Sequence, residues 1–302
     1  MNQRLILSLS VSVLLIGAVI LFASHPSTSL ASSDDEATAG CGDLHLNFDE
    51  QETVRSEQHL TIPSSAGPLS VHAAENGGIQ VMGGNQSQFE VTVCKAAAAD
   101  DRPTAQGRLA AISASVQGGQ LSVSGPGGGS WTAYLIVRAP RNAAMELAAH
   151  NGPISLRSLS GAVKAHSVNG PISLRECAGD IQATTENGPI SLRGGGGKLK
   201  LETQNGPISV DLSRSQWQEN GLEARTENGP LSLRVPGDYD AGVRVESAGH
   251  SPMRCSGAVC GQAQRTWDDE HRLIEFGSSS PAVRMSTVNG PVSVQSSGTE
   301  AD

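Results

Sequence analysis

One heptapeptide, Asn-Gly-Pro-Ile-Ser-Leu-Arg, recurs along this chain at a fixed spacing. It occupies residues 151–157, 169–175 and 187–193, so each copy begins 18 residues after the one before. Looser copies follow at offsets of 18, 23 and 61 residues and begin at Asn205, Asn228 and Asn289. A unit of 18 residues is too short to enclose its own core, so copies must stack and bury apolar faces against their neighbours. The repeat therefore predicts a solenoid.

The alternation of residues within one repeat predicts two strands and two corners. Ile181, Ala183 and Thr185 alternate with polar residues, so they share the inner face of one strand. Asn187 and Gly188 are residue types that tolerate a positive φ in a tight turn. A proline then opens the second strand, where its missing N–H is least costly. We expect an all-β fold, a single-stranded parallel β-solenoid (β-helix) with rungs of about 18 residues.

Stacking in register should align equivalent side chains about 4.8 Å apart. The turn asparagines should then form a ladder in which side-chain amides pair along the corner. We expect its members to be Asn151, Asn169, Asn187, Asn205, Asn228 and Asn289.

Composition and charge agree with a thin, exported repeat protein. The 302 residues include 35 Gly and 15 Pro but only 3% aromatic residues, a poor supply for a conventional core. The formal charge of −9 argues against nucleic acid as a partner. We expect one solenoid domain over residues 44–298, with an insertion near 252–277 that forms a hairpin or a short extra element.

The N-terminus predicts export. Arg4 precedes an apolar run over residues 5–23, and the small-residue triplet Ser-Leu-Ala ends at Ala31. Residues 1–31 are either a cleaved signal peptide or an uncleaved helix that anchors the protein in the membrane, and the sequence leaves both open. Residues 32–43 form a flexible tether. The rest of the chain is then either membrane-anchored at the cell envelope or secreted or periplasmic.

The order of these features resembles the bacterial putative-adhesin family of unknown function. The resemblance covers roughly residues 44–295 and rests on weak N-terminal turns, a strand closing on Ala139-Pro140, tandem Asn-Gly-x-Ile rungs and a final repeat from Met285. It implies a right-handed parallel β-solenoid displayed on the cell envelope. That family has no established catalytic residues, so none is transferred to this chain.

One outward column is a candidate for ligand binding. Register would place Arg157, Arg175, Arg193 and Arg234 in a line, interrupted by Asp211. Aligned guanidinium groups can hold carboxylates or phosphates of an anionic glycan, a lipid head group or a protein. The alternative is that each arginine pairs with a nearby carboxylate, such as Glu186, Glu202 or Glu227, and only keeps the surface soluble.

The chain contains five cysteines, and export to an oxidising compartment would favour disulfides between them. Cys255 and Cys260 could close a local hairpin, and Cys41 and Cys94 could tie the N-terminal segment to the body. Cys177 then has no partner, and its place in the repeat suggests an outward or corner position.

Two tryptophans stand outside the regular repeat. Trp217 lies in a rung enlarged at residues 213–220, which we expect to bulge as a loop, and Trp267 lies in the insertion. We expect both to cover an open end or a flank of the solenoid. The alternative is that an exposed tryptophan contacts a partner.

The sequence offers no pattern for catalysis, a cofactor or a metal. We expect a non-enzymatic display or binding protein of the envelope. One alternative is a structural or regulatory envelope protein that acts through self-association or stress signalling, for which a retained anchor and an uncapped solenoid end would be the distinguishing features. Another is a polysaccharide-degrading β-helix enzyme. A matched carboxylate pair for the last of these is not evident in the sequence.

Overall fold

The computed structural model describes residues 40–44, 48, 51–64, 67–214, 217, 221–248, 251–268, 271–277 and 280–297. The chain divides into two units, Met1–Ala37 and Thr38–Asp302, and every described residue belongs to the second. The expected signal or anchor segment, residues 1–31, and most of the expected tether lie outside the described residues. In the part that is described, no helix is long and apolar enough to cross a membrane.

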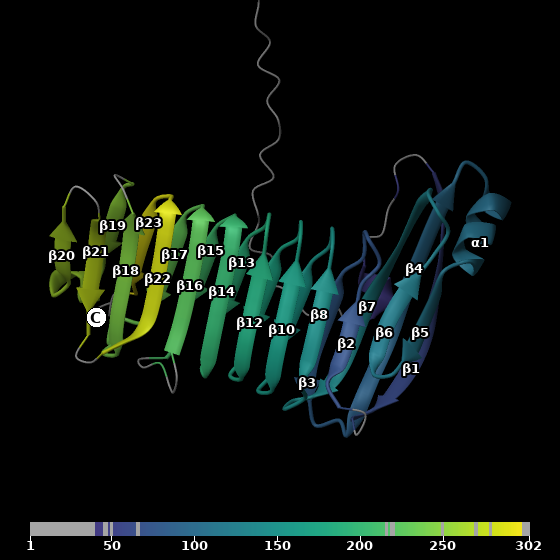
Figure 1. Ribbon diagram of the computed structural model, residues 1–302, viewed down its shortest axis with the longest axis horizontal. Coiled ribbons are helices and arrows are strands. Elements are labelled where there is room, and N and C mark those ends of the chain that lie inside the picture. The colour runs from purple at the N-terminus through teal and green to yellow at the C-terminus, as the bar shows by residue number, and fades with distance from the viewer. Residues whose placement is uncertain are drawn as a thin grey trace, which may run out of the picture. The chain divides into compact units, whose positions relative to one another are not determined.

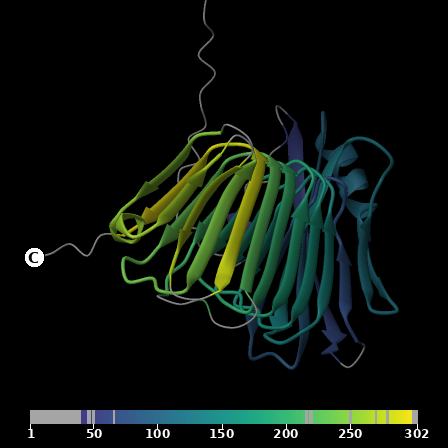
Figure 2. The same cartoon turned by 60° about the vertical axis from the view of Figure 1, so that its left-hand side comes forward.

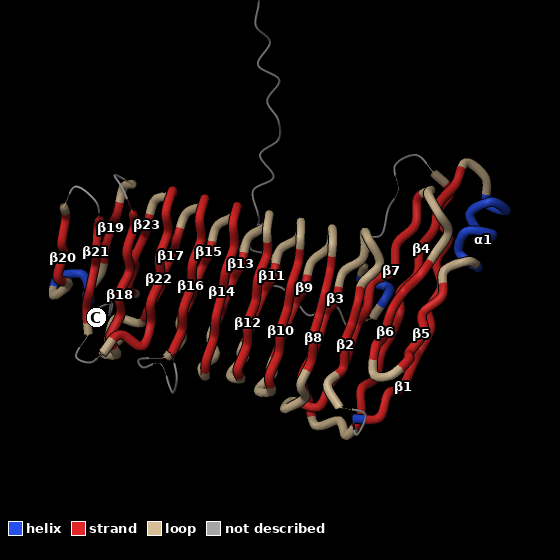
Figure 3. Tube along the Cα trace, viewed as in Figure 1, coloured by secondary structure: helices blue, strands red, loops and turns tan. Residues whose placement is uncertain are grey.

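Two large sheets make up this unit (Figures 1 and 3). Among the described residues, sheet A has 11 strands in the order β1 (Glu52–Pro63), β4 (Gln88–Ala99), β7 (Ser130–Pro140), β3 (Ile79–Gly84), β9 (Ile154–Arg157), β11 (Ile172–Arg175), β13 (Ile190–Arg193), β15 (Ile208–Asp211), β17 (Leu231–Val235), β23 (Val292–Ser296) and β19 (Met253–Ser256). Sheet B has 12, in the order β20 (Gln264–Trp267), β21 (His271–Phe276), β18 (Gly242–Ala248), β22 (Pro281–Asn289), β16 (Gly221–Asn228), β14 (Lys198–Asn205), β12 (Asp180–Thr185), β10 (Ala162–Ser167), β8 (Met145–Ala149), β2 (Leu69–His72), β6 (Gln120–Ser124) and β5 (Ser113–Gln117).

The middle of both sheets is a parallel stack, which confirms the all-β, solenoid-like prediction. Each repeat gives one strand to each sheet, so the chain alternates between them. In sheet A, Ile172 of β11 pairs with Ile154 of β9 on one side and Ile190 of β13 on the other. In sheet B, Ile181 of β12 pairs with Val163 of β10 and Leu199 of β14.

The core lies between the two sheets (Figure 2). Inward side chains alternate with outward ones on every central strand, so each strand contributes two or three apolar residues. Ile190 and Leu192 from sheet A, with Ile181 and Ala183 from sheet B, are at most 1% exposed. Small and branched residues suffice because the layer between the sheets is thin.

The ends of the stack differ from the predicted solenoid. At one end β4 runs antiparallel to both β1 and β7, β5 and β6 form an antiparallel pair, and the helix α1 (Arg102–Ala110) packs against β4 and β1. At the other end β21 runs antiparallel to β18 and β20. The parallel arrangement predicted for the solenoid therefore holds in the middle of the stack, whereas antiparallel strands occur at its ends.

Two rungs lie out of sequence order. The rung of β2 and β3 lies between those of β6–β7 and β8–β9, although it precedes both in the chain. The rung of β22 and β23 likewise inserts between those of β16–β17 and β18–β19, as the yellow β22 between β16 and β18 shows in Figure 1. The expected insertion near residues 252–277 thus supplies a strand of sheet A, β19, and a hairpin of sheet B.

The turn asparagines form a continuous ladder. Each Nδ2 donates to the Oδ1 of the preceding asparagine at 2.9 or 3.0 Å. The chain of amides runs through Asn76, Asn151, Asn169, Asn187, Asn205, Asn228 and Asn289. It joins seven rungs along one corner, including the one that begins near Asn76.

The glycine of the motif serves close approach, not a positive φ. The expectation of a positive φ at Asn-Gly is wrong, because neither Asn187 nor Gly188 has one. A Cβ on Gly188 would overlap the carbonyl of Gly170, and each later motif glycine meets its predecessor in the same way. Only glycine lets the corners stack this tightly.

Two further hydrogen bonds complete the corner. Ile172 N–H donates to the carbonyl of Pro189 at 3.0 Å, so the proline serves as an acceptor where its own nitrogen cannot donate. The buried hydroxyl of Thr185 donates to the carbonyl of Gly170 at 3.2 Å. Equivalent hydroxyls occur at Ser167, Thr203, Thr226 and Thr287.

Gly188→Ala should destabilise the fold by about 1–3 kcal/mol, because the new methyl group forces two stacked backbones apart. Gly107→Ala is the matched control: it lies inside α1 with open space around it, and should stabilise by about 0.5–1 kcal/mol. Urea unfolding followed by circular dichroism measures both. Equal stability of the two variants would contradict the stacking argument.

Asn187→Ala should cost more than Asn289→Ala. The first removes two ladder hydrogen bonds and the second removes one, each contributing about 0.5–1.5 kcal/mol. Thermal and urea unfolding of the two variants provide the comparison. A larger loss at Asn289 would mean that the ladder does not stabilise the corner.

Candidate binding face

The predicted arginine column exists as a register line on the outer face of sheet A. Arg157, Arg175, Arg193, Asp211 and Arg234 occupy equivalent positions on β9, β11, β13, β15 and β17. We call this line the arginine column. The inward neighbours on each strand are core residues, so alternation along the strand directs the column side chains outward.

A serine column runs beside it. It lies two positions earlier on the same strands and consists of Ser155, Ser173, Ser191, Ser209 and Ser232. Ser209 Oγ and Ser232 Oγ lie 3.4 Å apart. The outer face therefore presents two parallel lines of side chains to a ligand that lies across the strands. One line carries hydroxyl groups and the other carries mostly guanidinium groups.

The column has a carboxylate within it. Arg234 Nη1 lies 3.6 Å from Asp211 Oδ2, and both side chains are well exposed. Glu202, weighed above as an arginine partner, belongs to sheet B and contacts Lys200 at 2.9 Å instead. The hydrogen bond that Lys200 donates to Glu202, together with the negative charge of that carboxylate, raises the pKa of Lys200.

Sheet B has a different outer face. Its exposed charges are of both signs and several form ion pairs, although Arg244 of β18 and Arg284 of β22 lie directly opposite each other. Lys164 lies 3.4 Å from Glu146, and Lys198 lies 3.7 Å from Asp180. The two faces therefore differ in composition: sheet A carries four arginines and one aspartate at the column positions, whereas sheet B carries outward charges of both signs.

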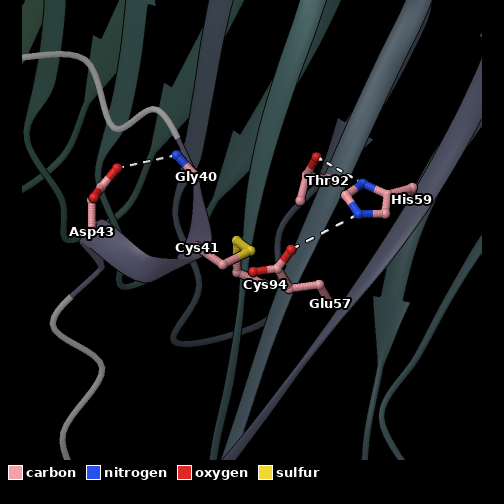
Figure 4. Close-up of a disulfide and its surroundings, with 7 residues drawn as sticks. All are labelled: Gly40, Cys41, Asp43, Glu57, His59, Thr92 and Cys94. Atoms are coloured by element: carbon pink, nitrogen blue, oxygen red, sulfur yellow. Dashed lines mark hydrogen bonds and ion pairs between the residues drawn. A yellow bond between two sulfur atoms is a disulfide. The ribbon is translucent and has the colours of Figure 1, made fainter.

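Four of the five cysteines form the two disulfides that the sequence suggested. Cys41, in the 3-10 helix η1 (Cys41–Asp43), is bonded to Cys94 of β4 (Figure 4). Cys255 of β19 is bonded to Cys260 of the 3-10 helix η3 (Ala258–Gly261). The first bridge holds the N-terminal segment on sheet A, and the second closes the turn after β19.

Cys177 lies at the corner between β11 and β12, one of the two positions that the sequence suggested, but its side chain is fully buried and does not face outward. The reason is a left-handed corner: Glu176 has a φ of 51°, which reverses the alternation and turns the next side chain inward. Its Sγ lies 3.4 Å from the carbonyl oxygen of Arg175. Burial raises the pKa of the Cys177 thiol.

The two tryptophans differ from each other. Trp217 is 8% exposed and its Nε1 donates to the Gly197 carbonyl at 2.9 Å, so it packs on a flank of the core. Most of the predicted loop around it lies outside the described residues. Trp267 in β20 is 49% exposed, so it does not serve as a buried cover. Among the described residues no group of three or more His, Cys, Asp or Glu is placed to hold a metal ion.

Comparison with known proteins gives only distant likenesses. No family model and no curated protein matches the sequence. A putative cell adhesion protein from Clostridium sporogenes matches over 81% of this chain and 100% of that chain, with 11% identity and a TM-score of 0.34. A putative adhesin from Bacteroides fragilis matches over 81% and 97%, with 11% identity and a TM-score of 0.41. Likenesses at this level carry no argument about function, and the family resemblance stays a prediction.

Cys177 should resist thiol reagents in the native protein, because burial blocks access and disfavours the thiolate. Ellman's reagent at pH 8 should react with no thiol in the folded chain, and with one per chain in urea without reductant. Rapid reaction of the folded chain would contradict the buried position. More than one thiol in urea would contradict the two disulfides.

Proposed function

We propose that this chain is a non-catalytic binding protein of the cell envelope, and that its arginine column holds a linear acidic polysaccharide. The polymer would lie across the strands of sheet A, with carboxylates on the guanidinium groups and hydroxyls on the serine column. Arginine suits this role because its planar fork donates two hydrogen bonds to one carboxylate.

One observation carries the proposal: outward residues are identical on sheet A but different on sheet B within the same repeats. Ser and Arg recur unchanged in the three exact heptapeptides, whereas the outward pair on sheet B changes from Lys164 and His166 to Gln182 and Thr184. The fold accounts for the asparagine, glycine, proline and apolar positions of the motif. Neither core packing nor corner stacking requires the serine or the arginine.

The spacing of the column supports an extended ligand. Parallel strands place successive arginines about 4.8 Å apart, a step comparable to one sugar unit of an extended polysaccharide. Arg157, Arg175 and Arg193 lie on three neighbouring strands, so three consecutive sugars could each meet one guanidinium group.

Two disulfides support export, because such bonds persist in oxidising compartments. Self-association through an open solenoid end is the alternative. It has less support, because antiparallel strands flank the parallel stack at both ends of sheet B and at one end of sheet A, although β19 is a parallel edge strand at the other. Whether the N-terminal segment is cleaved or retained does not change the proposal.

Changing Arg157, Arg175, Arg193 and Arg234 to Ser should weaken binding of the full chain to polygalacturonate by at least about tenfold, since one charge-assisted hydrogen bond contributes about 1.5–3 kcal/mol. The parent should bind more weakly as salt rises. Affinity is measured by titration calorimetry, with neutral dextran as the reference polymer.

The matched control changes four cations on sheet B, Lys164, Lys198, Lys200 and Arg225, to Ser. Both variants lose the same formal charge, so net charge cannot explain a difference between them. The control should bind like the parent. Equal loss in both variants, or no binding by the parent, would reject the arginine column as the binding face.

A further inference from the structure

A cleft of about 510 Å³ lies at the β19–β20 end of the molecule. Strands β19 and β23 of sheet A line one side, and the β20–β21 hairpin lines the other. This volume falls within the range of about 300–1,000 Å³ that is typical of small-molecule sites. The polar and aromatic groups used below are Arg254, Ser256, Arg265, Trp267, Ser293 and Gln295.

Trp267 offers the cleft an aromatic surface held in a fixed orientation. Its strand partner, Arg272, places Cζ 5.3 Å from the ring centroid. Arg272 is itself anchored, because its Nη1 donates to the carbonyl of Ser251 at 2.9 Å. The indole is 49% exposed, the highest value among the large apolar side chains of the described chain. A rigid, exposed indole of this kind is a ready stacking surface.

Two guanidinium groups supply the positive charge of the cleft. Arg265 Nη2 donates to the carbonyl of Cys260 at 3.3 Å, and the Cys255–Cys260 disulfide holds that turn against β19. Arg254 is an exposed residue on β19. The described residues that line the cleft include no carboxylate, so its charged groups are both cationic.

The cleft also continues the arginine and serine columns. Gln295 is in register with Arg234 on one side and Ser256 on the other. Ser293 is in register with Ser232 on one side and Arg254 on the other. A polymer that follows the columns toward this end of sheet A therefore reaches the cleft.

We infer that this cleft binds a sugar residue that carries a carboxylate, at or near one end of an acidic polysaccharide. The apolar C–H face of the sugar stacks on Trp267, and its carboxylate meets Arg254 and Arg265. Ser256, Ser293 and Gln295 provide partners for ring hydroxyls. The cleft supplies specificity for sugars, because the arginine column alone would accept any linear polyanion. The path of the polymer along sheet A rests on the proposed function.

The test compares tetragalacturonate with polyglutamate, which carries carboxylates but no sugar rings. Full-length parent, Trp267→Ala, Trp267→Phe and the four-arginine column variant are titrated with both. Trp267→Ala should bind tetragalacturonate about tenfold more weakly, because the stacking surface is lost, and should bind polyglutamate like the parent. Trp267→Phe should keep most of the sugar affinity, which separates stacking from a folding defect.

Fluorescence provides a second readout. Trp217 is buried, and Trp131 is partly buried with its Nε1 hydrogen-bonded to the Pro126 carbonyl, so acrylamide should quench Trp267 preferentially. Saturating tetragalacturonate should protect the parent from quenching, and polyglutamate should protect it much less. Protection should be absent in Trp267→Ala.

The outcomes separate the two proposals. Unchanged tetragalacturonate affinity in Trp267→Ala, or an equal loss for polyglutamate, would overturn the cleft. If, in that case, the column variant lost affinity for both tetragalacturonate and polyglutamate, the proposed function would stand without the cleft. Loss of tetragalacturonate in Trp267→Ala, with full polyglutamate binding by the column variant, would keep the cleft and reject the column.

Discussion

The close approach of stacked backbones at the Asn-Gly-Pro corner is the constraint on which the rest of this structure depends. Each motif glycine lies against the carbonyl of the glycine one rung before it, so any side chain there would separate the rungs. The asparagine ladder, the buried hydroxyls and the proline carbonyls then use the short distance between corners. Because side chains alternate with a period of two, a slip of one residue would turn the core outward, and the corner prevents that slip.

A stack built this way has a problem at its ends, where the last rung has no neighbour. The two ends of the stack have a similar arrangement. At each end one rung inserts between two others that are neighbours in sequence, and antiparallel strands lie outside it, except that the parallel strand β19 forms the edge of sheet A. An inserted rung is hydrogen-bonded on both sides, so it cannot peel away as a terminal rung would. The two disulfides lie in these end regions and not in the regular middle, where the corner contacts already hold the rungs together.

The sequence predicted the regular middle well because identical residues demand identical environments. The period, the inward Ile and Leu, the asparagine ladder and the outward Ser and Arg all followed from the repeat at residues 151–193. The ends did not follow, because strand order depends on pairings between distant segments that local patterns do not record. Nothing near Pro281 signals that β22 lies between β16 and β18. Cys177 was misplaced because Glu176 adopts a positive φ, a conformation that few side chains favour and that sequence rarely reveals. The Trp267 cleft was missed for the same reason as the end topology, since its residues come from four separate strands.

The arginine column places like charges opposite one another on the neighbouring strands β9, β11 and β13. Like charges directly opposite one another on neighbouring strands are destabilising, and two unit charges about 4.8 Å apart in water repel by roughly 1 kcal/mol. Sheet B offsets part of this cost with ion pairs between neighbouring strands, such as Lys164 with Glu146 and Lys198 with Asp180, although Arg244 and Arg284 also lie opposite each other there. Each 18-residue repeat contributes a strand to both sheets. Its outward residues could therefore differ between repeats on sheet A as they do on sheet B. A polyanion held as proposed would offset this repulsion at the rungs that carry an arginine, whereas Asp211 would oppose it on β15.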